Sequence, residues 1–128
     1  MNLLLDTHVF LWFIAGDDRL SKTARSLIED PANLVFLSQV SLWEMAIKIS
    51  LGKLSLSKPF ETLINEQLEE NQLQLLGITL QHSVGLISLP FHHRDPFDRM
   101  LIAQAQTEQL TLITQDSPIS LYDVNLAW

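Results

Sequence analysis

Short apolar runs without polar alternation constrain the fold of this chain most strongly. Leu3–Leu5 and Leu34–Leu37 are two such runs. A strand with one solvated face alternates apolar and polar residues, so these runs are typical of strands buried on both faces, as in the middle of a parallel sheet. Three further strands are predicted, at Leu73–Ile78, Leu110–Thr114 and Val124–Trp128.

Helical segments separate the predicted strands. Ser21 and Thr79 stand at N-cap positions, and Ser41 with Glu44 matches the capping-box pattern. Because strands alternate with helices, the chain is expected to form right-handed crossovers and a mostly parallel sheet covered on both faces. We therefore expect one domain, residues 1–128, with an α/β fold: a three-layer α/β/α sandwich around about five strands. The predicted helices span Val9–Ile14, Ser21–Ile28, Ser41–Ile49, Pro59–Glu70, Leu80–Ser88 and Pro96–Gln109.

Composition excludes several classes of function. The chain has no cysteine, which rules out disulfides, thiolate metal sites and a cysteine nucleophile. Its net charge of −7 argues against charge-driven binding of nucleic acid, but not against an enzyme that meets phosphate through a metal ion. The apolar N-terminus, Met1–Gly16, has no basic start and is too short to span a bilayer. These features predict a soluble, cytoplasmic protein without a membrane partner.

Four acids that are far apart in the sequence are predicted to meet at one edge of the sheet. Asp6 and Asp116 lie at or just past the ends of predicted strands, whereas Glu44 and Asp98 lie in the first turns of predicted helices. Ligands bind at this edge in open α/β sheets. Two unit charges roughly 4 Å apart repel by about 4 kcal/mol at an effective dielectric near 20, so gathered carboxylates require a cation. Oxygen ligands favour Mg²⁺ or Mn²⁺, which predicts metal-assisted phosphodiester hydrolysis.

Each acid also has a structural interpretation when it is taken alone. Asp6 can cap the following helix, Glu44 can complete a capping box, and Asp116 is an ordinary turn residue. Asp98 is a favourable anion near a helix N-terminus, but it shares a row with apolar residues that point to the core. Asp95 is interpreted as the N-cap of that helix, with a role beside the metal ion as its alternative. The presence of all four acids at one predicted sheet edge favours a functional site over four separate structural roles.

Four blocks of the sequence, in the same order along the chain, resemble PIN-domain nucleases and, among these, the VapC-type toxins of bacterial toxin–antitoxin pairs. They are Leu4-Leu5-Asp6-Thr7-His8, Ser41-Leu42-Trp43-Glu44-Met45-Ala46-Ile47-Lys48, Asp95-Pro96-Phe97-Asp98-Arg99-Met100-Leu101-Ile102-Ala103 and Thr114-Gln115-Asp116. The resemblance spans Leu3 to Trp128.

The resemblance implies a five-stranded parallel sheet and cleavage of RNA that depends on Mg²⁺ or Mn²⁺. It places the metal-binding and catalytic acids at Asp6, Glu44, Asp98 and Asp116, with the Thr114 hydroxyl close to them. It also implies a VapB-like antitoxin as protein partner, and a homodimer or a dimer of heterodimers.

Several neighbouring residues are further candidates. Arg94 and Arg99 flank Asp98, and Lys48 lies one turn beyond Glu44. Our hypothesis is that one or more of these cations contact substrate phosphate, the alternative being a solvated surface charge. His8 is interpreted as a hydrogen-bonded structural histidine, with a general base as the alternative. The 92–93 histidine pair has no ligand partner at a convincing spacing.

Other functions stay open from the sequence alone. The chain could be another Mg²⁺-dependent phosphohydrolase, acting on DNA or on a phosphomonoester. A receiver-like phosphoacceptor domain is a second alternative, but it needs adjacent acids after the first strand, where this chain has Thr7 beside Asp6. It also needs a Lys after the fifth strand, and no Lys follows Asp116. A third alternative is an inactive module that only binds a protein partner.

Overall fold

A five-stranded parallel sheet forms the centre of the molecule. The computed structural model describes residues 1–128, and its strands follow the order β3-β2-β1-β4-β5 with every neighbouring pair parallel. This confirms the α/β fold and the strand number predicted from the sequence. The third, fourth and fifth strands are shorter than predicted. The strands are β1 (Asn2–Leu5), β2 (Leu34–Ser38), β3 (Gln74–Leu76), β4 (Thr111–Ile113) and β5 (Leu126–Ala127).

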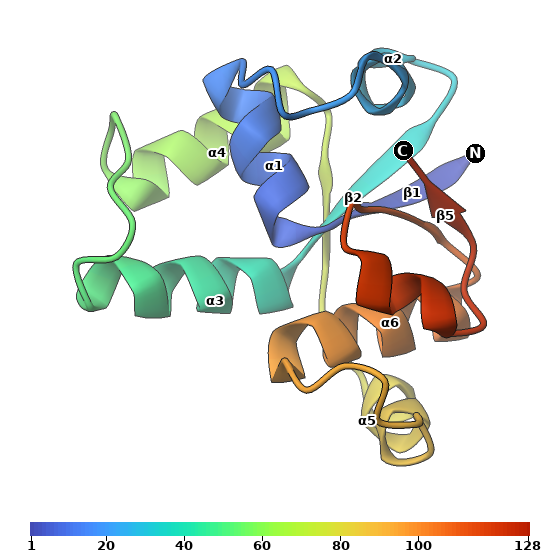
Figure 1. Ribbon diagram of the computed structural model, residues 1–128. Helices are drawn as coiled ribbons and strands as arrows, with labels where there is room; N and C mark the ends of the chain where they lie inside the picture. The colour runs from blue at the N-terminus through green and yellow to red at the C-terminus, as the bar shows by residue number, and fades with distance from the viewer.

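Helices cover both faces of the sheet, as Figure 1 shows: α1, α2 and α4 lie on one side, and α5 and α6 on the other. None of the helices combines the length and the apolar character needed to cross a membrane. The helices are α1 (Thr7–Ala15), α2 (Lys22–Glu29), α3 (Gln39–Ser50), α4 (Phe60–Glu70), α5 (Leu80–Ile87) and α6 (Pro96–Glu108), with a short 3₁₀ helix at Ser117–Leu121.

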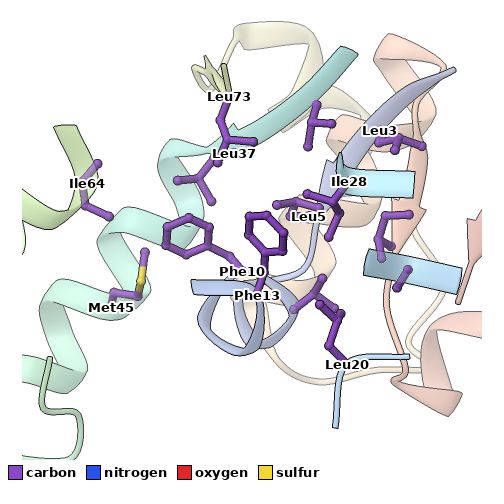
Figure 2. Close-up of a cluster of buried hydrophobic side chains, with 14 residues drawn as sticks. Leu3, Leu5, Phe10, Phe13, Leu20, Ile28, Leu37, Met45, Ile64 and Leu73 are labelled. Atoms are coloured by element: carbon purple, nitrogen blue, oxygen red, sulfur yellow. The ribbon is translucent and has the colours of Figure 1, made fainter. Parts of the chain in front are cut away.

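Two hydrophobic clusters hold these layers together. In β1, Leu3 and Leu5 belong to the cluster under α1, α2 and α4, whereas Leu4 belongs to the cluster under α6. Figure 2 shows the first cluster, in which Phe10 of α1 lies among side chains from the strands and from neighbouring helices. All four of these side chains have no exposed surface, and complete burial of each contributes roughly 1.5–3 kcal/mol. This two-sided burial explains why β1 has no polar alternation.

The start of α3 differs from the prediction. Ser38, not Ser41, is the N-cap: its hydroxyl accepts a hydrogen bond from the Val40 N–H at 3.0 Å and donates one to Gln104 Oε1 at 2.6 Å. Ser41 lies inside the helix, where its hydroxyl accepts from the buried Thr7 hydroxyl at 2.8 Å. The capping box is therefore wrong, and Glu44 lies in the second turn of α3. The predicted caps at Ser21, Thr79 and Asp95 are confirmed.

The order of the strands places a ligand-binding edge beside β1. From β1 the chain proceeds to β2 and β3 on one side of the sheet, then crosses to β4 and β5 on the other. In such sheets the loops after the two central strands diverge and leave a crevice at the carboxyl edge. Asp6 directly follows β1, and Thr114 directly follows β4.

Candidate active site

The predicted acids come from four different elements and gather at this edge. Asp6, Asp98 and Asp116 line one cavity of about 320 Å³, together with His8 and Trp12 among others. Asp6 ends β1, Asp98 lies in the first turn of α6, and Asp116 follows β4. Glu44 does not line this cavity, but its charge contributes to the raised pKa of Asp98. The structure therefore brings three of the four acids into one cavity, with the fourth near enough to act electrostatically on Asp98.

Asp6 caps α1, as its structural interpretation predicted, and it also lines the acidic cavity. Its Oδ1 accepts the His8 N–H at 3.1 Å and so caps α1, while its Oδ2 accepts the Thr114 hydroxyl at 2.6 Å. Burial raises the pKa of Asp6, but the hydrogen bonds from His8 and Thr114 outweigh this effect, so the pKa lies below its ordinary value. Asp6 is thus held as a buried carboxylate, oriented by the first turn of α1 and by the end of β4.

Thr114 connects two of the acids. Its hydroxyl donates to Asp6 and accepts the Asp116 N–H at 3.1 Å. We expect Thr114→Val to destabilise the protein by roughly 1–3 kcal/mol, because the buried Asp6 oxygen and the Asp116 N–H each lose a partner. Urea denaturation measures this loss. Thr111→Val, three residues earlier in β4 and with a partly exposed side chain, is the matched control. Equal stability of the two variants would contradict the bridging role.

Glu44 carries the clearest sign of a missing partner. The residue is 4% exposed, and its Oε2 pairs with the Lys48 ammonium at 2.7 Å. Its other oxygen, Oε1, is buried without any hydrogen-bond partner. A buried carboxylate oxygen left unpaired is costly, and a cation satisfies it. The residues present therefore fit a bound metal ion, and the all-carboxylate donor set suits a hard divalent one.

His93 lies within the acidic cluster, although no sequence pattern predicted it there. Its Nε2 lies 2.9 Å from Asp116 Oδ2 and 3.0 Å from Asp98 Oδ2. One atom from each of these three residues falls within 4.8 Å of the other two. The prediction that neither histidine of the 92–93 pair has a ligand partner is wrong for His93. The loop before α6 brings His93 to its partners, and no helical or strand period predicts the path of that loop. His92 contacts the Tyr122 ring instead.

Asp98 has the most perturbed pKa in the cluster. Burial, together with repulsion from Asp6, Asp95 and Glu44, raises its pKa to about 7, while His93 opposes the shift. For His93, burial lowers the pKa, but the hydrogen bond to Asp116 and the nearby carboxylates outweigh it and raise the pKa. Without a cation, the cluster is therefore poorly suited to holding all its negative charges at neutral pH.

The raised pKa of Asp98 predicts a pH-dependent stability of the metal-free protein. Between its ordinary value of 3.8 and about 7, the folded state keeps a proton that the unfolded state releases. The free energy of unfolding therefore falls as pH rises through this range, by up to about 4 kcal/mol. We expect urea denaturation with a chelator present to show this decline for the wild type and a smaller one for Asp98→Asn. The exposed Asp123→Asn should keep the wild-type slope. Identical slopes in all three proteins would contradict the shift.

Arg99 is not a surface charge. The residue is 7% exposed, and its guanidinium donates to the Pro90 and Leu89 carbonyl oxygens and to the Tyr122 hydroxyl. The hypothesis that Arg99 contacts phosphate is therefore replaced by a role in anchoring the loop before α6. Its position could have been found from the helix phase, since Ile102 is buried one turn further along.

The other candidates occupy the surroundings of the cluster. Lys48 is engaged by Glu44, and Arg94 is exposed in the loop before α6. His8 lines the cavity with its side chain 57% exposed, and its Nδ1 lies 3.9 Å from Asp6 Oδ1, which raises the pKa of His8. Asp95 caps α6 by accepting the N–H groups of Phe97 and Asp98, as its first interpretation required.

Comparison with known proteins identifies the family. Residues 3–125 match the PIN domain, and the chain belongs to the PIN-domain family. It is 31% identical over 116 residues to ribonuclease VapC22 of Mycobacterium tuberculosis, covering 90% of this chain and 87% of that protein. The receiver-like alternative is thereby excluded, and the strand order agrees, because receiver domains follow the order 2-1-3-4-5.

Solved structures share the fold at low sequence identity. The VapBC2 complex of Rickettsia felis, bound to a DNA fragment from its promoter, has a TM-score of 0.73 at 14% identity and covers 99% of this chain and 98% of its own. The DNA-bound VapBC complex of Salmonella typhimurium has a TM-score of 0.72 at 15% identity, with coverage of 99% and 97%.

Proposed function

We propose that this chain, acting as a single PIN domain over residues 1–128, is a divalent-metal-dependent endoribonuclease and the toxin of a VapBC-like pair. The observation that carries the proposal is the convergence of Asp6, Asp98 and Asp116 on one cavity, together with the unpartnered Oε1 of buried Glu44, whose charge acts on Asp98. Its relative from Mycobacterium tuberculosis is a ribonuclease, which favours RNA as the substrate over DNA or a small phosphate ester.

Asp6, Glu44, Asp98 and Asp116 would hold the metal ion, Mg²⁺ or Mn²⁺. When bound, such an ion supplies Lewis-acid chemistry to phosphodiester hydrolysis. The chain's own residues orient the ligands. Thr114 fixes one oxygen of Asp6, and Lys48 fixes one oxygen of Glu44 while leaving the other free.

Substrate binding has to overcome a net charge of −7. We propose that exposed Arg94, in the loop that also carries His93, contacts a substrate phosphate, because its guanidinium has no ion-pair partner in the fold. His8 at the cavity rim is a second polar group within reach of a bound nucleotide. Neither is needed to hold the metal ion.

A VapB-like antitoxin is the proposed protein partner, with a homodimer or a dimer of heterodimers as the assembly. The solved structures that share this fold include VapBC complexes. A groove of about 690 Å³, lined equally by apolar and by polar or charged residues, lies beside the acidic cavity, and His8 and Trp12 line both. A partner segment in this groove would reach the acids directly. Light scattering on the purified chain, alone and with the candidate antitoxin, measures the assembly.

Sequencing of RNA 5′ ends after brief expression tests the proposed function. We expect new ends at defined positions with the wild type and none with Asp98→Asn. Purified wild type should give the same ends only when Mg²⁺ or Mn²⁺ is added. Cleavage restricted to DNA or to small phosphate esters would contradict the proposal and favour the alternative phosphohydrolase.

A further inference from the structure

The imidazole of His93 is fixed in place by the loop that carries it. Its own backbone N–H donates to the Tyr122 hydroxyl oxygen at 2.9 Å, and that hydroxyl donates to the Pro90 carbonyl at 2.7 Å. On the ring, Nδ1 accepts the Asp95 N–H at 3.1 Å. Because both the backbone and the ring are held, the remaining nitrogen, Nε2, can point in only one direction.

The hydrogen bond from Asp95 also determines the tautomer. A ring nitrogen that accepts an N–H carries no proton, so a neutral His93 has its proton on Nε2. This Nε2–H is hydrogen-bonded to Asp116 Oδ2 at 2.9 Å, and Asp98 Oδ2 lies 3.0 Å from the same nitrogen. His93 therefore offers the acid cluster a donor and not a lone pair.

This arrangement is the reverse of the one found at metal-binding histidines. A ligating histidine usually donates its second ring N–H to a carboxylate or a carbonyl, which directs the lone pair of the first nitrogen at the metal. In His93 the second nitrogen faces a donor, the Asp95 N–H. A lone pair on Nε2 would require a proton on Nδ1, and that proton would oppose the Asp95 N–H.

We propose that His93 is a positioning residue that holds the carboxylates of Asp98 and Asp116 together through its Nε2–H, and that it does not itself ligate the metal ion. The inference rests on the proposed function, which assigns these two carboxylates to the metal. Asp98 comes from α6 and Asp116 from the segment after β4, so no shared element fixes their separation. An N–H that is hydrogen-bonded to Asp116 and lies within 3.0 Å of Asp98 offsets the repulsion between the two carboxylates and keeps the pair in place.

Binding of Mn²⁺ to three purified variants tests this inference. His93→Ala removes the donor, and we expect its Mn²⁺ affinity to fall about tenfold or more, as at other residues that orient metal ligands. His93→Gln keeps an N–H donor of similar reach and should stay within about threefold of the wild type, because it restores the hydrogen bond. The neighbouring His92→Ala, at an exposed position, is the matched control and should bind as the wild type does. Calorimetry gives the affinities.

Electron spin-echo measurements on bound Mn²⁺ separate positioning from ligation. A positioning residue gives no directly coordinated ¹⁴N signal that depends on His93. A ¹⁴N coupling present in the wild type and lost in His93→Gln would overturn the inference, as would unchanged Mn²⁺ affinity in a folded His93→Ala. Failure of the wild type to bind Mn²⁺ would instead contradict the proposed function itself, and the inference with it.

Discussion

Asp98→Asn is expected to abolish divalent-dependent RNA cleavage, with a loss of about 10³-fold or more, equivalent to roughly 4 kcal/mol of transition-state stabilisation. The substitution removes one negative charge from the proposed metal ligands while keeping the size of the side chain. It also places an amide where a carboxylate oxygen now lies 3.0 Å from His93 Nε2. Cleavage of a labelled RNA at saturating Mg²⁺ or Mn²⁺ measures the effect.

The fold of Asp98→Asn should persist, and its metal-free form should be more stable than the wild type at neutral pH. Burial and neighbouring acids raise the pKa of Asp98 to about 7, so the charged form destabilises the folded state. Asp123→Asn makes the same chemical change at an exposed position outside the cavity and should cleave normally. Full cleavage by Asp98→Asn would contradict the site assignment. Unfolding would show that Asp98 is a structural acid.

The strands and the position of the candidate site were predictable because local residue pattern and tertiary burial agree there. Leu3–Leu5 lacks polar residues because both faces of β1 are buried, and the same strand delivers Asp6 to the carboxyl edge of the sheet. Pro96 at the first helical position and Asp95 at the cap fix the start of α6 locally. That start in turn fixes the direction of Asp98.

The start of α3 was not predictable, because two serines compete for the cap. Ser41 with Glu44 matches the local capping pattern better. Ser38 is nevertheless the N-cap, because its hydroxyl has a tertiary partner, Gln104 of α6, which is 66 residues away. Capping patterns depend only on neighbouring residues, so they cannot predict that contact.

His93 escaped prediction for a related reason. It lies in a loop, where no period indicates which way a side chain points, and its second carboxylate partner, Asp116, is 23 residues away. The loop conformation depends on Tyr122 and Arg99, which were not connected to it from the sequence.

Arg99→Met is expected to destabilise the protein by roughly 2–4 kcal/mol, because it leaves buried carbonyl groups without donors. The Arg99 guanidinium donates to Pro90 O at 2.8 Å, to the Tyr122 hydroxyl at 3.3 Å and to Leu89 O at 3.4 Å. It also lies 4.2 Å from the centre of the Phe91 ring. Met fills much of the same volume, so the loss reports the donors and not a cavity. Urea denaturation measures it.

Arg94→Met is the matched control, with the same change five residues earlier at an exposed position, and its stability should stay within about 0.5 kcal/mol of the wild type. The comparison separates two roles for an arginine beside the site. A loop anchor loses stability when no RNA is present, and its loss of cleavage follows from displacement of the loop that holds His93. An arginine that only binds phosphate keeps its stability and loses RNA affinity together with part of the salt dependence. Equal stability of the two variants would therefore contradict the anchoring role of Arg99 and favour a role in substrate binding.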